Sequence, residues 1–183
     1  MKLSRLLESV HQIRLLTESG GELGMALRDF ATSVGSEIKW ALGGGLAAGF
    51  HARPRGTQDV DIFVQSENEV EKLKSICTRP KFAWGRQHAI THLYTGAEIE
   101  ILSPEFLKRN PIVIKRAIET AEIHDGIPVV SKEGLIALKL QRAEHKDLGD
   151  IEEILQKHGE VDLSGFDLTN EQIRIYQSLK RLD

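Results

Sequence analysis

The pattern of apolar positions in the first third of the chain changes from helical spacing to alternation. Hydrophobic residues recur every three or four positions over residues 2–18 and again over 22–34, which predicts two helices separated at Gly20-Gly21. Apolar and polar residues then alternate from Glu37 to Leu42, which predicts a strand. A second strand is expected over residues 58–64, after a glycine-rich turn, a short helix and a loop.

The rest of the chain alternates short strands with helices, an order that predicts an α/β or α+β fold. Ser66 and Glu69 form the sequence signature of a capping box, which predicts a helix over 66–78. Further strands are predicted over 81–84, 89–95 and 97–102, followed by a strand pair that turns at Asp125-Gly126. Further helices are predicted over 104–110, 111–120, 131–145, 147–158 and 168–181.

These elements suggest three parts of one compact unit. We expect an N-terminal helical segment over residues 1–36 that packs on a core over 37–130, and C-terminal helices over 131–183. The composition is that of an ordinary globular protein, with 183 residues, 40% hydrophobic residues and a net charge of −3. This charge gives no support for a nucleic-acid coat or a membrane-surface role.

The distribution of apolar and charged residues favours a cytoplasmic protein with no membrane association. No segment approaches the roughly 18 apolar residues of a membrane span. The first helix carries Arg5, Glu8 and His11 where a signal peptide needs an unbroken apolar run. Cys77 is the one cysteine, so an intramolecular disulfide and a cysteine-cluster zinc site are excluded, and we expect it to be a packing residue.

The strand over residues 58–64 carries the candidate chemistry of the chain. Because strand side chains alternate between faces, Asp59 and Asp61 project on one side, while Val60, Ile62 and Val64 enter the core. Two neighbouring carboxylates repel each other, and a hard divalent cation such as Mg²⁺, or Mn²⁺, relieves the repulsion. The alternative is a strand end with two solvated aspartates.

The triglycine Gly43-Gly44-Gly45 lies between a predicted strand and a short helix. Such a turn lets backbone N–H groups approach a phosphate, and the following helix N-terminus favours anions. The loop that leads to the aspartates contains four further polar residues, namely His51, Arg53, Arg55 and Thr57. Arginine forks match phosphate oxygens. The alternative is an ordinary turn followed by a solvated basic loop.

Residues from Gly43 to Asp61 resemble the signature of the DNA polymerase β-like nucleotidyltransferase superfamily. The similarity is closest to the small bacterial group of abortive-infection toxin nucleotidyltransferases, which carry a double glycine, a His near Arg-x-Thr, and Asp-hydrophobic-Asp. A second segment resembles the C-terminal helical motif of that group: Ala137-Leu138-Lys139-Leu140, followed by Arg142, Lys146-Asp147 and Asp150. The resemblance covers about residues 37–155.

The resemblance implies a small mixed sheet flanked by helices and in-line nucleotidyl transfer assisted by two metals. It assigns Gly43 and Gly44 to the triphosphate and Asp59 and Asp61 to the metal. Gly44 stands where many superfamily members have serine, so a hydroxyl contact to phosphate is lost.

The resemblance also implies a third carboxylate on a later strand, acting as a general base. Glu98 and Glu100 both face one side of the strand over 97–102, so either can supply it, and the other is then a solvated strand residue. We prefer Glu100 because two apolar residues follow it, as is typical of the family. Aspartate is more usual there, and glutamate reaches farther.

Basic residues follow one face of the helix over 131–145. Lys139, Arg142 and Lys146 lie at helical spacing, and Lys139 falls within an apolar run. Lys139 either snorkels across apolar surface to water or faces the site, where the site acids or a triphosphate would be its partners. We favour the site, with Asp147 orienting or pairing with these bases.

Other polar residues give weaker signals. His88 and His92 lie on predicted strands, where their spacing carries no zinc-binding logic. Four basic residues form a local cluster that either contacts an RNA acceptor or is a solvated face: Lys108, Arg109, Lys115 and Arg116.

The sequence therefore predicts a nucleotidyltransferase that moves a nucleoside monophosphate from an NTP to an acceptor hydroxyl on RNA such as tRNA, on a protein or on a small molecule. The predicted metal ligands and catalytic residues are Asp59, Asp61 and Glu100. The predicted phosphate-binding residues are Gly43, Gly44, Gly45, Arg55, Thr57, Lys139 and Arg142. The alternative is a non-catalytic nucleotide-binding or antitoxin-like module of a toxin–antitoxin pair. The sequence does not determine the oligomeric state.

Overall fold

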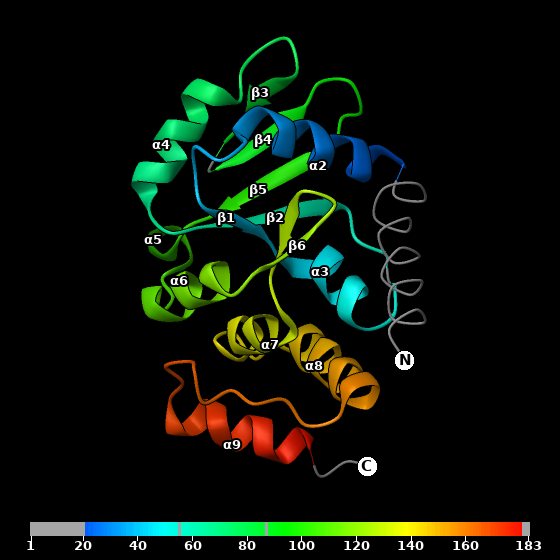
Figure 1. The fold of residues 1–183 in the computed structure, drawn as a ribbon, viewed down its shortest axis with the longest axis vertical. Coiled ribbons are helices and arrows are strands. Elements are labelled where there is room, and N and C mark those ends of the chain that lie inside the picture. Colours follow the sequence, from blue (N-terminus) through cyan, green and yellow to red (C-terminus); the bar gives the residue numbers. More distant parts are fainter. Residues whose placement is uncertain (1–20, 55, 87, 181–183) are drawn as a thin grey trace.

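The computed structural model describes residues 21–54, 56–86 and 88–180. The helix predicted over residues 2–18 and the candidate phosphate ligand Arg55 lie outside these ranges. Within them, the chain forms seven strands and eight helices. The predicted α/β (α+β) class, with a mixed sheet flanked by helices, is confirmed (Figure 1).

The sheet places the strands in the order β3-β4-β5-β2-β1-β7-β6. The β2–β5 and β1–β7 pairs are parallel, and the other four pairs are antiparallel. The strands are β1 (Trp40–Leu42), β2 (Asp59–Val64), β3 (Phe82–Trp84), β4 (Ala89–His92), β5 (Glu98–Leu102), β6 (Glu122–His124) and β7 (Ile127–Val129). The central β2–β5 pair brings together two segments that are far apart in the sequence.

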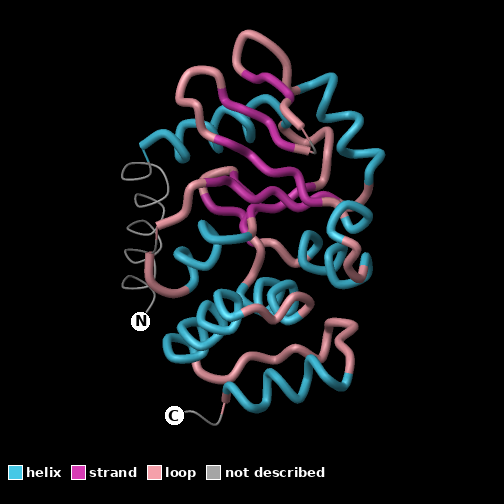
Figure 2. Tube along the Cα trace, turned by 180° about the vertical axis from the view of Figure 1, so that it is seen from behind, coloured by secondary structure: helices cyan, strands magenta, loops and turns pink. Residues whose placement is uncertain are grey.

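Helices cover both faces of this sheet (Figure 2). They are α2 (Gly21–Val34), α3 (Gly44–His51), α4 (Glu67–Ile76), α5 (Pro104–Leu107), α6 (Pro111–Glu119), α7 (Lys132–Leu140), α8 (His145–His158) and α9 (Asn170–Leu179). Helices α2 and α4 lie on one face, and α3 and α6 lie on the other (Figure 1). Helices α7, α8 and α9 contact one another beyond α3 and α6, so the second face is covered by two layers.

The apolar side chains of β2 that the alternation predicts to be in the core are buried in the structure. Val60, Ile62 and Val64 on β2 are each 0% exposed, and so are Ile99 and Ile101 on the neighbouring β5. Burial of a large aliphatic side chain contributes roughly 1.5–3 kcal/mol. Burial of the apolar face of β2 therefore holds in place the strand whose other face carries the two aspartates.

Several element boundaries differ from the prediction. The first strand is confined to β1, and α3 already begins at Gly44. Helix α5 is a single turn because Lys108 adopts a left-handed conformation, with φ 53°. The capping box is confirmed, since the Ser66 N–H donates to the Glu69 carboxylate at 2.9 Å. The part of the chain that the structure describes has no helix with the length and apolar character needed to cross a membrane.

Residues without a predicted site role occupy structural positions. Cys77 is buried, and burial raises the pKa of its thiol to about 12, as expected of a packing residue. His88 and His92 form separate pairs, with Glu67 at 3.2 Å and with Asp29 at 3.0 Å. These contacts place the two histidines in different local networks.

Candidate active site

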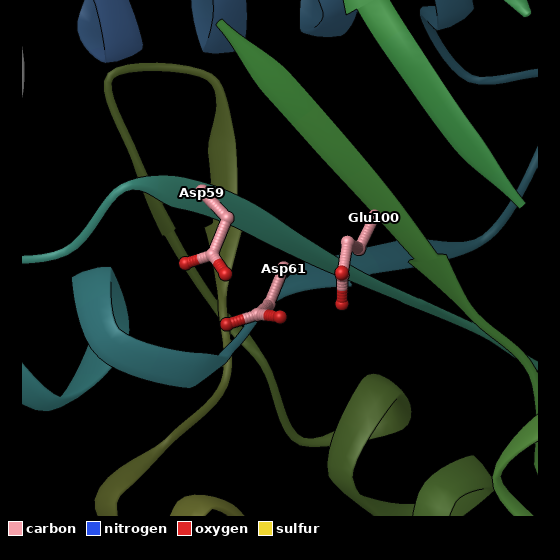
Figure 3. Close-up of side chains that lie close together, drawn as sticks. All are labelled: Asp59, Asp61 and Glu100. Atoms are coloured by element: carbon pink, nitrogen blue, oxygen red, sulfur yellow. The ribbon is translucent and has the colours of Figure 1, made fainter. Parts of the chain in front are cut away.

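Three carboxylates from the two central strands converge on one face of the sheet (Figure 3). Asp59 and Asp61 come from β2 and Glu100 from β5, where Glu100 is paired in register with Asp61. One oxygen from each carboxylate lies within 4.8 Å of the other two. Glu98 is paired with Asp59 but is exposed, and among the described residues the cluster contains Glu100 and not Glu98.

The electrostatics of the cluster show that its negative charges interfere with one another. Burial, followed by the charge of Asp59, raises the pKa of Asp61 above its ordinary value. Burial, followed by the charge of Asp61, likewise raises the pKa of Glu100. None of the described lysines or arginines forms an ion pair with these three acids. A set of oxygen ligands with this charge fits a hard divalent cation such as Mg²⁺ or Mn²⁺.

The glycine turn holds Asp61 in position. The Gly43 N–H donates to the Asp61 backbone carbonyl at 2.9 Å, and the Gly45 N–H donates to the Asp61 carboxylate. Gly44 has φ +55°, and a Cβ added there would lie 1.5 Å from the Asp61 carboxylate oxygen Oδ2. A side chain at position 44 is therefore excluded both by the backbone conformation and by the carboxylate. Gly44 and Gly45 line the cavity in front of the acids.

Thr57 and His51, two polar residues predicted near phosphate, instead bind groups of the protein. The Thr57 hydroxyl donates to Asp59 Oδ1 at 2.8 Å, so it orients a candidate metal ligand. His51 is buried, with its Nε2 2.6 Å from the Val130 carbonyl oxygen. Burial lowers the pKa of His51 to about 4, which keeps the ring neutral at neutral pH.

The cavity, of about 190 Å³, is also lined by basic residues of the helical layer. Lys139 on α7 is 7% exposed, and its Nζ lies 3.2 Å from Asp147 Oδ1 and 2.5 Å from Asp150 Oδ2. The side chain therefore does not snorkel to water. Its acidic partners belong to α8. Asp147 is the pairing partner that the sequence analysis offers for these bases, and Asp150 takes the place of the acids of the site.

Arg142 completes this ion-pair network. Its Nε and Nη2 donate to the two oxygens of Asp147 at 2.5 and 2.9 Å, which is a bidentate contact. Burial raises the pKa of Asp147, but the hydrogen bonds from Arg142 and the charge of Lys139 outweigh it, so the pKa lies below its ordinary value. The predicted pairing of Asp147 with the basic residues is present in the structure.

Arg109 is a cavity residue that the sequence interpretation did not place in the site. It belongs to the connection between α5 and α6 and lines the cavity together with the carboxylates and Arg142. Burial, followed by the charge of Arg142, lowers the pKa of Arg109. The other members of its basic cluster, Lys108, Lys115 and Arg116, are exposed. Among these four residues only Arg109 lines the cavity, and the packing of α6 against α7 that places it there has no local sequence signal.

Comparison with solved structures identifies a related fold. The structure is similar to the crystal structure of an antigenic nucleotidyltransferase-like protein from Paracoccidioides brasiliensis, with a TM-score of 0.59 and 18% sequence identity over 85% of each chain. Searches with the sequence found no matching family model and no matching curated protein. The likeness shows a nucleotidyltransferase-like fold, and the narrower resemblance to the abortive-infection toxin group stays a prediction.

Proposed function

We propose that the protein is a divalent-metal-dependent nucleotidyltransferase that transfers a nucleoside monophosphate from an NTP to an acceptor hydroxyl. The observation that carries the proposal is the convergence of Asp59, Asp61 and Glu100 on one face of a nucleotidyltransferase-like fold. A scaffold gains nothing from three juxtaposed acids, and the raised pKa values of two of them, Asp61 and Glu100, are a feature that is common at catalytic sites.

The three carboxylates are the metal ligands in this proposal. Asp59, Asp61 and Glu100 would hold Mg²⁺ or Mn²⁺. When bound, the cation would neutralise phosphate charge and stabilise the reacting oxygens. Thr57 orients Asp59, and the glycine turn orients Asp61. These contacts fix the ligand atoms before substrate binds, which lowers the reorganisation that the reaction requires.

Glu100 is the proposed general base. Its carboxylate lies in the same cluster as Asp59 and Asp61, where it could accept the proton of an acceptor hydroxyl bound beside the cation. The acceptor oxygen then forms a bond to the α-phosphorus of the NTP, and the bond from that phosphorus to the bridging oxygen breaks. The products are the nucleotidylated acceptor and pyrophosphate, and the proton resides on Glu100.

The test is transfer of label from each α-³²P-labelled NTP, with Mg²⁺, to the RNA, protein and small-molecule fractions of a cell extract. We expect the parent to label one fraction, and both EDTA and Asp61→Asn to abolish the labelling. Glu98→Gln is the matched control, because Glu98 is exposed and lies outside the carboxylate cluster, and it should retain activity.

Nucleotide binding by calorimetry separates this proposal from its alternative. NTP binding that is equally tight in Mg²⁺ and in EDTA, combined with no label transfer by the parent, would contradict catalysis. That result would instead favour a non-catalytic nucleotide-binding module.

A further inference from the structure

The four basic residues that line the cavity differ in whether a carboxylate of the protein forms an ion pair with them. They are Arg109, Lys139, Arg142 and Lys146. Lys139 and Arg142 are matched by Asp147 and Asp150 in the buried network. Arg109 and Lys146 make no side-chain hydrogen bond or ion pair with any described residue. The cavity therefore has two cations that remain available to an anionic ligand.

Arg109 is held in place by the backbone around it. Lys108 adopts φ 53° at the end of α5, and the Asn110 N–H donates to the Gln141 side-chain oxygen at 2.8 Å. The Asn110 side-chain amide donates to Asp167 Oδ2 at 2.9 Å. This segment is thus anchored to the residue that precedes Arg142. Anchoring lowers the entropy that binding costs, because the loop is already ordered.

Arg109 lies near charges of both signs but contacts none of them directly. The residue is partly buried, and burial and the charge of Arg142 disfavour its protonated form, whereas the more distant charges of Asp147, Glu144 and Asp61 favour it. Among the described residues, Arg109 is not one of those with a fully buried side-chain nitrogen that lacks a hydrogen-bond partner, so its guanidinium nitrogens are accessible from the cavity. A guanidinium with five donors can therefore receive phosphate oxygens from the cavity. Lys146, in the first turn of α8, adds a second charge on the same side.

We propose that Arg109 and Lys146 form an anion subsite that binds the polyphosphate chain of the nucleotide, on the helical side of the cavity across from the carboxylates. The nucleotide as ligand rests on the proposed function, whereas the affinity for polyphosphate does not. This subsite takes the role that the sequence interpretation gave to Lys139, whose charge is engaged by Asp147 and Asp150.

Titration calorimetry with inorganic tripolyphosphate in EDTA tests the subsite without metal or chemistry. We expect Arg109→Gln and Lys146→Gln each to weaken binding by about 10-fold or more, the scale of a charge-assisted hydrogen bond. Arg109→Lys, which keeps the charge but loses the fork, should recover part of the affinity. Lys108→Gln is the matched control, because this exposed neighbour lies outside the cavity lining, and its isotherm should match the parent.

Two outcomes overturn the subsite: a parent that does not bind tripolyphosphate, or an Arg109→Gln isotherm that overlays the parent's. Thermal unfolding of each variant checks that folding is retained. Weakened tripolyphosphate binding by Arg109→Gln, together with no label transfer by the parent, would keep the subsite and contradict the nucleotidyltransferase. Label transfer by the parent with unchanged tripolyphosphate binding in Arg109→Gln would do the reverse.

Discussion

The sheet side and the helical side of the cavity contain aspartates whose pKa values are shifted in opposite directions. Asp61, on β2, has a raised pKa because burial and the charge of Asp59 both disfavour its ionised form. Asp147, on α8, has a lowered pKa because Arg142 and Lys139 bind it directly. Asp147 is buried and Asp61 is half-buried, so the degree of burial does not account for the opposite directions of their pKa shifts.

The comparison separates structural charges from functional ones. On the helical side the protein supplies the counter-charges itself, and the result is a closed ion-pair network that joins α7 to α8. On the sheet side the direct contacts to Asp59 and Asp61 come from the Gly45 N–H and the Thr57 hydroxyl, whereas Lys139 and Lys146 act on Asp61 without forming an ion pair with it. A bound cation should therefore stabilise the folded protein more at the unpaired acids of the sheet side than at the paired acids of the helical side.

The largest effect is expected from the helical side. Lys139→Met keeps most of the packing but removes the cation that Asp147 and Asp150 share, so we expect a loss of about 3 kcal/mol in unfolding free energy. Lys146→Met removes a cavity cation that makes no ion pair with a described residue, and its stability should change little. Urea unfolding of the two variants makes the comparison. Equal losses would show that the network does not stabilise the fold.

On the sheet side, Gly44→Ala tests the contact between the glycine turn and Asp61. A left-handed conformation costs alanine about 1–2 kcal/mol, and the added Cβ displaces the Asp61 carboxylate. We therefore expect a loss of stability of this size, accompanied by loss of the stabilisation that Mg²⁺ confers on the parent.

Gly149→Ala is the control for Gly44→Ala, because it should change the stability in the opposite direction. Gly149 lies within α8, and a Cβ there would meet nothing within 4 Å. Alanine should raise stability by up to about 1 kcal/mol because it favours the helix. A Gly44→Ala protein that matches the parent in both stability and Mg²⁺ response would contradict the proposed contact.

The sequence predicts local features of the site better than the partners that complete it. Asp59 and Asp61 are two positions apart on one strand, so the alternation of side chains is enough to predict that they lie on the same face. The convergence with Glu100 depends on β5 pairing in parallel with β2, across a separation that no local pattern encodes. The preference for Glu100 came from the family resemblance, since alternation puts Glu98 on the same side.

Lys139 and Arg109 show the same limit on the helical side. An apolar run predicts that Lys139 needs a partner, and the sequence offers Asp147 as one, but the pairing with Asp150 in place of the site acids depends on how α8 folds back against α7. Arg109 looks like its exposed neighbours in the sequence and differs from them only through the packing of α6 against α7. Tertiary contacts, which propensity and periodicity do not encode, determine both positions.

A smaller effect should follow from removing one charge of the carboxylate cluster. Without metal at neutral pH, Asp61→Asn should stabilise the protein by up to about 1 kcal/mol, the scale of a like-charge contact between paired strands. Because the folded-state pKa of Asp61 is raised, the folded protein binds this proton more tightly than the unfolded chain does. The parent therefore loses stability as pH rises from the ordinary value of 3.8 through the raised pKa.

The difference between parent and Asp61→Asn should accordingly vanish at low pH, where both residues are neutral. Thermal unfolding in EDTA across the acid range measures it. Excess Mg²⁺ should reverse the order at neutral pH, because the cation binds the folded parent more tightly than the variant. A stability difference that is independent of both pH and Mg²⁺ would indicate that the charge of Asp61 is not the cause.

The smallest effect should distinguish Glu98 from Glu100 on a single strand. Both face the same side of β5, but Glu98 is exposed and Glu100 lies in the carboxylate cluster. Glu98→Gln should raise stability without metal by only a few tenths of a kcal/mol, because the Glu98 charge raises the pKa of Glu100 across solvent. It should leave the Mg²⁺ response intact, whereas Glu100→Gln should weaken that response. Calorimetric Mg²⁺ titration of both variants measures the difference, and the opposite ranking would place the third ligand at Glu98.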